Sequence, residues 1–347
     1  MLLLISRHCE PSQKAWQSMS LKRYLSLITS LRAHAMGAAI YACFLILIGC
    51  AATSTYQLPE PPVKQGYIKI NDGKLFYQVV GKGDPVIVIH GGPGLDQGYL
   101  LPGMAALAKK HQVVFYDQRG SGRSIVSKVD PQHINTEQFV EDLESLRKAL
   151  GFSKVTLVGH SWGGFLALRY AIKYAPNLNK IVIMNSLPIT TASIHDLVES
   201  VEERVKPSAA EIDKILSSPE FEAGDPETVS RYYSFYFKHY MYNPNDLSKI
   251  NMQLEPQGTA SGVAVSKILE EEIFSTFIDL TDDLKKVKVP TLIIHGEEDI
   301  VPLHTAQEIL KSIKGSQLVV IKQCGHVPYV EKPQEWLEAM EKFLKAY

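Results

Sequence analysis

Short runs of apolar and mostly β-branched residues recur along this chain from residue 67 onward. Six of them cover residues 86–89, 113–116, 155–158, 181–184, 291–294 and 318–321. Crossover helices bury the strands of a parallel sheet on both faces, so such strands are continuously apolar rather than alternating. The six runs therefore predict the buried strands of a parallel sheet.

Two further strands and several helices are expected around these runs. Residues 67–70 and 75–80 flank the turn Asn71-Asp72-Gly73, which is typical of a β-hairpin. Helical spacing of apolar residues marks residues 136–150, where Phe139 and Leu143 follow a plausible N-cap, and also residues 162–174, 303–313 and 333–346. Alternating strands and helices predict an α/β fold with helices on both faces of a mostly parallel sheet.

The alternation stops in the middle of the chain. Between residues 187 and 286 no buried strand run occurs, and Glu-rich and Tyr-rich helical patterns are punctuated by prolines. We interpret residues 187–286 as an inserted helical cap over the edge of the sheet. The α/β core is then expected at residues 67–186 and 287–347, with no internal repeat.

The first 50 residues form a separate segment. Residues 35–52 carry no charge, and the basic residues Lys14, Lys22, Arg23 and Arg32 precede them, which is typical of an export signal. The apolar run ends in Leu-Ile-Gly followed by Cys50, which resembles a bacterial lipobox with Cys50 as the lipidated residue. An uncleaved anchor remains an alternative because the run is just long enough to span a bilayer, and a later start at Met19 would give a more ordinary signal.

Both membrane interpretations predict the same location for the folded domain. The basic residues before the run should stay in the cytoplasm, so the catalytic domain is expected outside it, held to a membrane through its N-terminus. Residues 51–66 contain Pro59, Pro61 and Pro62 and are interpreted as a linker.

Composition and charge indicate a globular protein and give no support for nucleic-acid binding. Of the 347 residues, 45% are hydrophobic and 21% are charged, which is a normal balance for a globular protein. The formal net charge of −1 gives no electrostatic reason to expect nucleic acid as a partner. Of the four cysteines only Cys324 lies in the predicted domain, so no disulfide is expected within that domain.

The strongest chemical motif is Gly-His-Ser-Trp-Gly at residues 159–163. It follows a predicted strand and opens a predicted helix, which is the strand–turn–helix context of a nucleophile elbow. A sharp turn exposes the hydroxyl of Ser161, and the helix N-terminus adds positive potential where an oxyanion would form. Ser161 is the candidate nucleophile, and the N–H of Trp162 is a candidate oxyanion donor.

A second motif, His-Gly-Gly-Pro-Gly, occupies residues 90–94 at the end of another predicted strand. Glycines let backbone N–H groups approach a reacting centre closely. Oxyanion holes in this architecture combine the N–H after the nucleophile with one from such a loop, so Gly92 is the second candidate donor.

An acid and a base should follow the nucleophile along the chain. The strand at residues 291–294 runs into His295-Gly296-Glu297-Glu298-Asp299, where Asp299 is our candidate acid and Glu298 its neighbouring competitor. The last strand runs into Gly325-His326, and His326 is the candidate general base. His90, His160 and His295 also lie near strand ends, where we expect them to support packing and loops.

Taken together, residues 90–94, Asp-Gln-Arg-Gly-Ser-Gly-Arg-Ser at residues 117–124 and Gly-His-Ser-Trp-Gly-Gly at residues 159–164 resemble α/β-hydrolases of the proline iminopeptidase family. The resemblance extends from about residue 67 to the C-terminus. It implies a Ser161–His326–Asp299 triad, a helical cap, no metal or organic cofactor, and release of an N-terminal residue, typically proline, from short peptides. Residues 117–124 are then expected to form a structural loop near the site.

Two departures from that family leave the substrate open. His160 stands where proline iminopeptidases commonly have glycine, and Ile300 stands where some related aminopeptidases place a carboxylate for the substrate's ammonium group. The cap offers Glu202, Glu203, Glu270, Glu271 and Glu272 as other candidates, and Tyr232, Tyr233, Phe235, Tyr236, Phe237 and Tyr240 as an aromatic stretch. A carboxylic-ester or lactone hydrolase, or a non-catalytic binding protein on the same scaffold, remains the alternative to a peptidase, and the oligomeric state is not predicted.

Overall fold

The computed structural model describes residues 64–345. The predicted export segment with Cys50 and nearly all of the predicted linker lie outside these residues. The first strand, β1 (Lys64–Ile70), begins three residues earlier than expected, so residues 64–66 belong to the sheet rather than to the linker. None of the helices in the described part of the chain is both long and apolar enough to cross a bilayer.

A nine-stranded sheet runs through the domain in the order β1-β2-β4-β3-β6-β7-β8-β9, with β5 paired to β2. β1 and β2 form the predicted antiparallel hairpin, β2 is antiparallel to β4, and the sheet is parallel from β4 to β9. The remaining strands are β2 (Gly73–Val80), β3 (Pro85–Ile89), β4 (Gln112–Tyr116), β5 (Ile125–Val126), β6 (Val155–His160), β7 (Leu178–Met184), β8 (Thr291–Gly296) and β9 (Gln317–Ile321). The two-residue strand β5 was not predicted.

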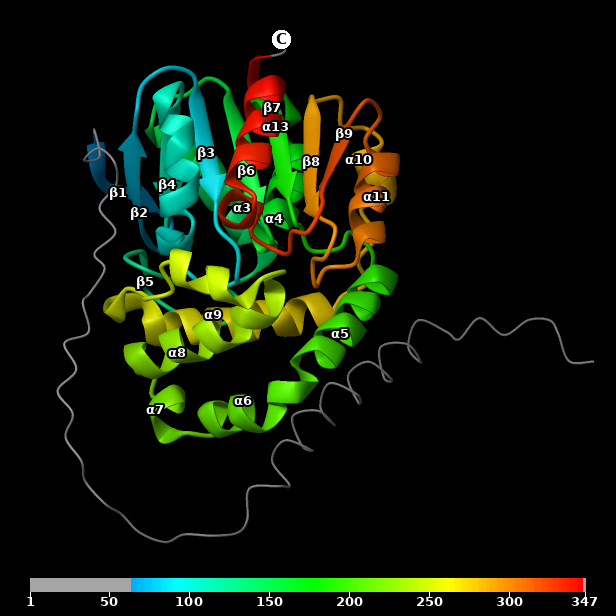
Figure 1. The fold of residues 1–347 in the computed structure, drawn as a ribbon. Coiled ribbons are helices and arrows are strands. Elements are labelled where there is room, and N and C mark those ends of the chain that lie inside the picture. The colour runs from blue at the N-terminus through cyan, green and yellow to red at the C-terminus, as the bar shows by residue number, and fades with distance from the viewer. Residues whose placement is uncertain (1–63, 346–347) are drawn as a thin grey trace, which may run out of the picture.

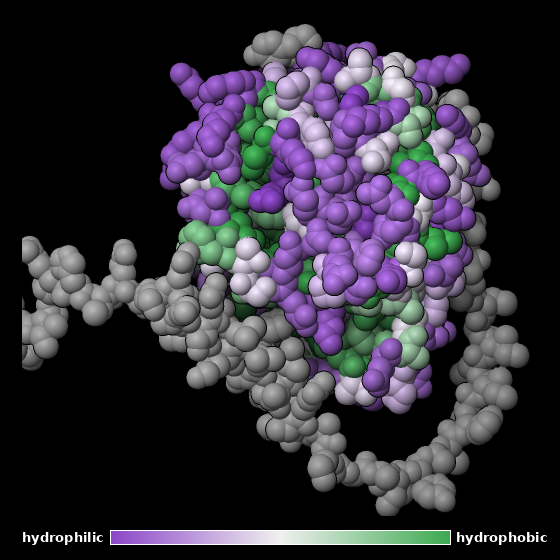
Figure 2. All heavy atoms as spheres, turned by 180° about the vertical axis from the view of Figure 1, so that it is seen from behind, coloured by the Kyte–Doolittle hydropathy of each residue, from purple (hydrophilic) through white to green (hydrophobic). Residues whose placement is uncertain are grey.

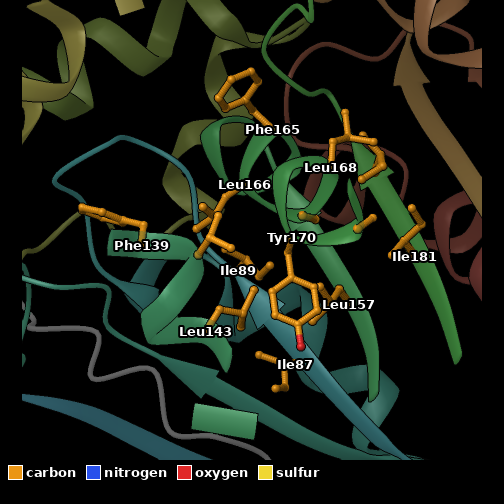
Figure 3. Packing of buried hydrophobic residues seen from close by; sticks show 14 of the residues in the cluster. Ile87, Ile89, Phe139, Leu143, Leu157, Phe165, Leu166, Leu168, Tyr170 and Ile181 are labelled. Atoms are coloured by element: carbon orange, nitrogen blue, oxygen red, sulfur yellow. The ribbon is translucent and has the colours of Figure 1, made fainter. Parts of the chain in front are cut away.

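Helices cover both faces of the sheet, as the apolar runs predict. Successive residues of a strand point to opposite faces, and β3 shows this directly: Ile87 and Ile89 join one core cluster, whereas Val86 and Val88 join the other. Figure 3 shows the first cluster, where side chains of α3 and α4 such as Phe139 and Tyr170 pack over the strands. The helices on that face are α3 (Thr136–Ala149), α4 (Trp162–Tyr174), α10 (Thr281–Leu284) and α11 (Leu303–Ser312).

The opposite face is covered by segments from both ends of the domain. The helix α13 (Pro333–Lys345) buries Trp336, Met340 and Phe343, which recur at helical spacing, against the sheet. Shorter segments complete this layer, namely η1 (Gln97–Tyr99), α2 (Leu101–Met104), η2 (Ala105–Lys109) and α12 (Pro328–Glu331). Most of the surface in Figure 2 is hydrophilic, with small separate apolar areas, as expected for a domain that buries its apolar residues in these two layers.

The insertion after β7 is helical, as predicted. It lies below the carboxyl ends of the parallel strands in Figure 1. Its ends are tied together, since the Thr191 N–H donates to the Ile278 carbonyl at 2.7 Å and the Leu280 N–H to the Ile189 carbonyl at 3.0 Å. Its helices are α5 (Thr191–Val205), η4 (Lys206–Ser208), α6 (Ala209–Leu216), α7 (Pro219–Glu222), α8 (Pro226–Phe237), η5 (Lys238–Tyr240), η6 (Pro244–Lys249) and α9 (Pro256–Ser275).

The insertion is shorter than the predicted cap at its C-terminal end. Residues 281–284 form α10, whose Leu284 is buried in the same cluster as α4 and α11. A single short helix without a strand beside it cannot be assigned to core or cap from its own sequence, because its apolar face is the same in either case.

Candidate active site

Ser161 lies at the sharp turn between β6 and α4. Its backbone has φ 56° and ψ −122°, a conformation that residues other than glycine rarely adopt. The flanking glycines make the turn possible: a Cβ on Gly159 would collide with the backbone of Gly163, and one on Gly163 with the Ile89 carbonyl. Backbone strain of this kind costs on the order of 1–3 kcal/mol and persists where the surrounding packing enforces it.

Asp299 and His326 meet beside this turn. The His326 Nδ1 atom lies 2.9 Å from Asp299 Oδ1, and both side chains are buried. Burial alone would raise the pKa of the Asp299 carboxyl, but the His326 ring next to it, with His295 and Asn185, holds that pKa below its ordinary value. The competing acid Glu298 is exposed, whereas Asp299 is buried against the histidine.

Asn185 is a contact of the acid that the sequence analysis did not identify. It follows β7 with φ 47°, and its Nδ2 donates to Asp299 Oδ2 at 2.7 Å and to the Gly325 carbonyl at 3.2 Å. Asn185 thus orients the carboxylate from the side opposite to His326. The available signal was its place at the carboxyl end of a buried strand, together with an asparagine's tolerance of a left-handed backbone.

The loop after β3 passes close to Ser161. A Cβ on Gly91 would lie 2.9 Å from the Ser161 Cβ, so only glycine fits there. His90 fixes the next peptide, because its Nδ1 lies 2.8 Å from the Gly91 carbonyl oxygen while its Nε2 accepts from the Gln118 N–H at 3.0 Å. This arrangement requires a neutral ring, and burial lowers the pKa of His90 to about 4. The same peptide carries the Gly92 N–H, so His90 orients the predicted oxyanion donor.

Trp162, whose backbone N–H is the second predicted oxyanion donor, is also held by a hydrogen bond of its side chain. The Trp162 indole Nε1 donates to Gln118 Oε1 at 2.9 Å, and Gln118 Nε2 donates to the His90 carbonyl at 2.7 Å. One glutamine side chain thus joins the two loops that carry Gly92 and Trp162. This gives residues 117–124 the supporting role that was expected. Arg119 in the same loop is buried and makes two 2.8 Å hydrogen bonds to Asp142.

The serine hydroxyl and the histidine ring are not joined directly. Among residues 64–345 the structure has no hydrogen bond between Ser161 and the His326 ring. Catalytic hydrogen bonds are often long before substrate is bound and tighten in the complex. His326 is packed instead by the rings of His160, at a centroid distance of 4.8 Å, and of Tyr240, at 5.1 Å.

The cap reaches the site through α9 and through the segment after α8. The Gly94 loop and α9 touch at Gly262, since a Cβ on either glycine would collide with the other's carbonyl. The His326 N–H donates to the Tyr240 carbonyl at 2.9 Å. On the acid side, Arg204 of α5 donates to the Asp299 carbonyl at 3.2 Å. The cap therefore contacts both the loop that carries His326 and the loop that carries Asp299.

Among the described residues, no group of three or more His, Cys, Asp or Glu side chains is arranged to hold a metal ion.

Comparisons with known proteins identify the family and the fold of the chain. The family described as the α/β hydrolase fold matches residues 84–333. The chain is 32% identical over 293 residues to a proline iminopeptidase of Saccharolobus solfataricus, covering 81% of this chain and 92% of that protein. It is 29% identical over 294 residues to a proline iminopeptidase of Thermoplasma volcanium, covering 81% and 97%.

Among solved structures, an α/β-fold hydrolase from Bacillus anthracis superposes with a TM-score of 0.62 at 21% identity, covering 81% of this chain and 99% of that one. At this identity the superposition supports the fold alone. The family match and the proline iminopeptidase relatives extend over most of the sheet, the elbow and the cap. The chain therefore belongs to the α/β-hydrolase fold family and is a hydrolase similar to proline iminopeptidases.

Proposed function

We propose that this protein is a serine hydrolase in which Ser161, His326 and Asp299 form a catalytic triad. The observation that carries the proposal is the buried 2.9 Å contact between His326 Nδ1 and Asp299 Oδ1, next to a serine held at φ 56°. A carboxylate in this position fixes the histidine tautomer that leaves Nε2 free to accept a proton, and it stabilises the charged ring that results.

The proposed reaction has two halves. His326 Nε2 takes the Ser161 proton while Oγ attacks the scissile carbonyl, and the Gly92 and Trp162 N–H groups donate to the resulting oxyanion. His326 then gives the proton to the leaving group, and the bond to that group breaks to leave an acyl-serine. Water deprotonated by His326 attacks the acyl-serine, releases the acid and restores the serine hydroxyl.

We propose further that the leaving group is the remainder of a short peptide, so that the enzyme releases N-terminal residues, typically proline. The sequence similarity to two proline iminopeptidases supports this choice. Such a reaction needs an acceptor for the ammonium group of the substrate. Because Ile300 follows Asp299, that acceptor has to come from elsewhere, and we expect it in the cap, which contacts the His326 and Asp299 loops.

Burial and contacts separate the candidate cap carboxylates. Glu202, Glu203 and Glu271 are exposed, and Glu272 accepts from the Thr136 N–H at 2.9 Å. Glu270 is partly buried and accepts from the Ser266 hydroxyl at 2.8 Å, on the helix that touches Gly94.

The charge of Glu270 acts on the cap tyrosines Tyr233 and Tyr236. Burial raises the pKa of Tyr236 to about 12, and the charge of Glu270 adds to the rise. The Tyr236 ring lies 5.4 Å from that of Tyr240, which in turn packs on His326. Its partial burial, its place on the helix that touches Gly94 and the effect of its charge on Tyr236 make Glu270 our choice among the five as the acceptor of the ammonium group.

Replacing Glu270 with glutamine tests this assignment. The variant should lose about 10- to 100-fold in kcat/KM on a proline arylamide, which corresponds to one hydrogen bond to a charged group. It should hydrolyse a short-chain aryl ester without an amine as fast as the parent protein does. The exposed neighbour Glu271→Gln is the matched control, and equal losses on both substrates would reject Glu270 as the ammonium acceptor.

A carboxylic-ester or lactone hydrolase is the second candidate function. The buried Ile300 beside the acid favours it, because an apolar side chain there offers nothing to an ammonium group. The ratio of kcat/KM for a proline arylamide to that for a short-chain aryl ester, measured on the full-length protein, separates the two functions. A high ratio supports the aminopeptidase, a low ratio supports the esterase, and no turnover of either substrate supports a non-catalytic binding protein.

We also propose, from the sequence alone, that Cys50 is lipidated and holds the domain to a membrane outside the cytoplasm. Cys50→Ser should then block processing, so that a longer precursor without acyl chains accumulates. An uncleaved anchor predicts no change in size or membrane association for the same variant. Intact mass of the membrane fraction, with incorporation of labelled fatty acid, distinguishes the two outcomes.

A further inference from the structure

A chain of buried hydrogen bonds runs beneath the serine elbow. The Gly91 N–H donates to the Tyr99 hydroxyl oxygen at 2.6 Å, and that oxygen lies 2.8 Å from His160 Nδ1. On the other side of the ring, His160 Nε2 lies 2.7 Å from the carbonyl oxygen of His326. Tyr99, His160 and His326 are all buried.

The chemistry of these groups fixes the direction of each bond. The His326 carbonyl can only accept, so His160 Nε2 carries a proton and donates it. Nδ1 of the neutral ring is then an acceptor, and it receives the single proton of the Tyr99 hydroxyl. Burial, followed by the neighbouring His326, lowers the pKa of His160 to about 3, so this arrangement persists at any pH near neutrality.

The chain connects three parts of the site that come from different segments of the sequence. Gly91 precedes the oxyanion donor Gly92, His160 precedes the nucleophile Ser161, and His326 is the base. These residues follow or end β3, β6 and β9 respectively, and Tyr99 belongs to η1. Ring packing reinforces the connection, since the His160 ring lies 4.8 Å from that of His326 and 5.6 Å from that of Tyr99.

We propose that Tyr99 and His160 are positioning residues, which hold the His90–Gly91 peptide, directly before the oxyanion donor Gly92, and the backbone of His326 in fixed places relative to Ser161. Neither side chain takes part in the reaction. Their contribution is to keep the oxyanion donor and the base aligned with one carbonyl carbon at the same time. This inference rests on the proposed roles of Ser161, His326 and Gly92.

Small displacements of positioned groups are costly in catalysis. A shift of about 1 Å, caused by a change away from the reacting atoms, can lower the rate by about 100-fold. The groups that the chain aligns act mainly in the transition state, so its loss should lower kcat and leave KM nearly unchanged.

Tyr99→Phe removes only the hydroxyl and is the main test. We expect kcat to fall by about 10- to 100-fold, with KM within about twofold of the parent value. The rate of serine phosphonylation by a fluorophosphonate should fall by the same factor, because that reaction uses the same nucleophile, base and oxyanion donors. The matched control is Tyr329→Phe, a buried tyrosine whose ring also contacts His160, at 5.6 Å, but whose hydroxyl donates to the Tyr99 backbone carbonyl at 3.5 Å rather than to the Tyr99 hydroxyl or to His160.

Variants of His160 test the second link. A glutamine amide can reach the position of His160 Nε2 and donate to the His326 carbonyl in its place. Alanine removes both hydrogen bonds of the ring, the one with the Tyr99 hydroxyl and the one with the His326 carbonyl. His160→Gln should therefore retain more of kcat than His160→Ala. The double variant Tyr99→Phe/His160→Ala should lose less than the two single losses multiplied together, because both substitutions remove the same bond between Tyr99 and His160.

The outcomes separate this inference from the proposed function. If Ser161 is phosphonylated and Tyr99→Phe matches Tyr329→Phe in kcat, or changes KM alone, the positioning role is wrong and the serine mechanism stands. Additive losses in the double variant would also overturn the shared chain. If Ser161 is not phosphonylated and Ser161→Ala keeps its activity, the proposed function itself fails.

Discussion

Replacing Ser161 with alanine should lower kcat by at least about 10³-fold while the domain stays folded. Covalent catalysis is lost because no hydroxyl remains at the elbow, and what activity remains comes from the oxyanion donors and substrate binding. The substitution removes a single oxygen from a side chain that makes no hydrogen bond within the described residues, so the thermal midpoint of unfolding should change little. Steady-state rates on the better of the arylamide and ester substrates, with a thermal melt, measure both effects.

Ser186→Ala is the matched control for this loss. Ser186 is a buried serine next to the same helix, close to Gly164, and its hydroxyl donates to the Leu187 carbonyl at 2.9 Å. It should keep most of its kcat, because its hydroxyl is bonded to the Leu187 carbonyl and not to a member of the proposed triad. Activity retained in Ser161→Ala, or an equal loss in Ser186→Ala, would remove Ser161 from the role of nucleophile.

Asp299→Asn is expected to have the next largest effect. The amide fills the same volume, but its NH₂ group can face His326 Nδ1 only if that nitrogen gives up its proton, which places the proton on Nε2. The ring would then be unable to accept the serine proton, and kcat should fall by on the order of 10²- to 10⁴-fold, with a smaller change in KM.

The neighbouring acid provides the comparison for this prediction. Glu298 is exposed one residue away, so Glu298→Gln should leave kcat close to that of the parent protein. If Glu298→Gln is the damaging substitution and Asp299→Asn is mild, the acid has been assigned one residue too late. Parallel kcat and KM measurements on the two variants settle the assignment.

Most of the core could be predicted from sequence because most of its strands are buried on both faces. The run at residues 318–321 is the exception: it forms the edge strand β9, in which only Ile321 is buried. Every strand run expected from residue 86 onward is present within a few residues of its predicted bounds, and the helix at residues 162–174 has the expected bounds. The boundaries between core, linker and cap were harder to predict. β1 begins within the expected linker, and α10 belongs to the core although it was assigned to the cap. Half-exposed segments have weak hydrophobic patterns. Their structure therefore depends on the strands and helices against which they pack, and their own sequence does not show these neighbours.

The candidate site was predictable where chemistry coincides with a strand end. Ser161, Asp299 and His326 each follow a recognisable apolar run, and the fold brings the acid and the histidine together. Asn185 and Tyr99 were missed because their contacts depend on which loops become neighbours in space. The three other histidines, expected to support packing, do so in a specific way: His295 Nε2 lies 2.9 Å from the Val301 carbonyl, while His90 and His160 hold the loops beside the serine.

The site of phosphonylation tests the central claim most directly. The full-length protein would be treated with a fluorophosphonate, digested, and mapped by mass spectrometry. We expect one adduct, on the peptide that contains Ser161, formed in step with the loss of hydrolytic activity. An adduct on another serine, or full activity after complete labelling of Ser161, would contradict this expectation.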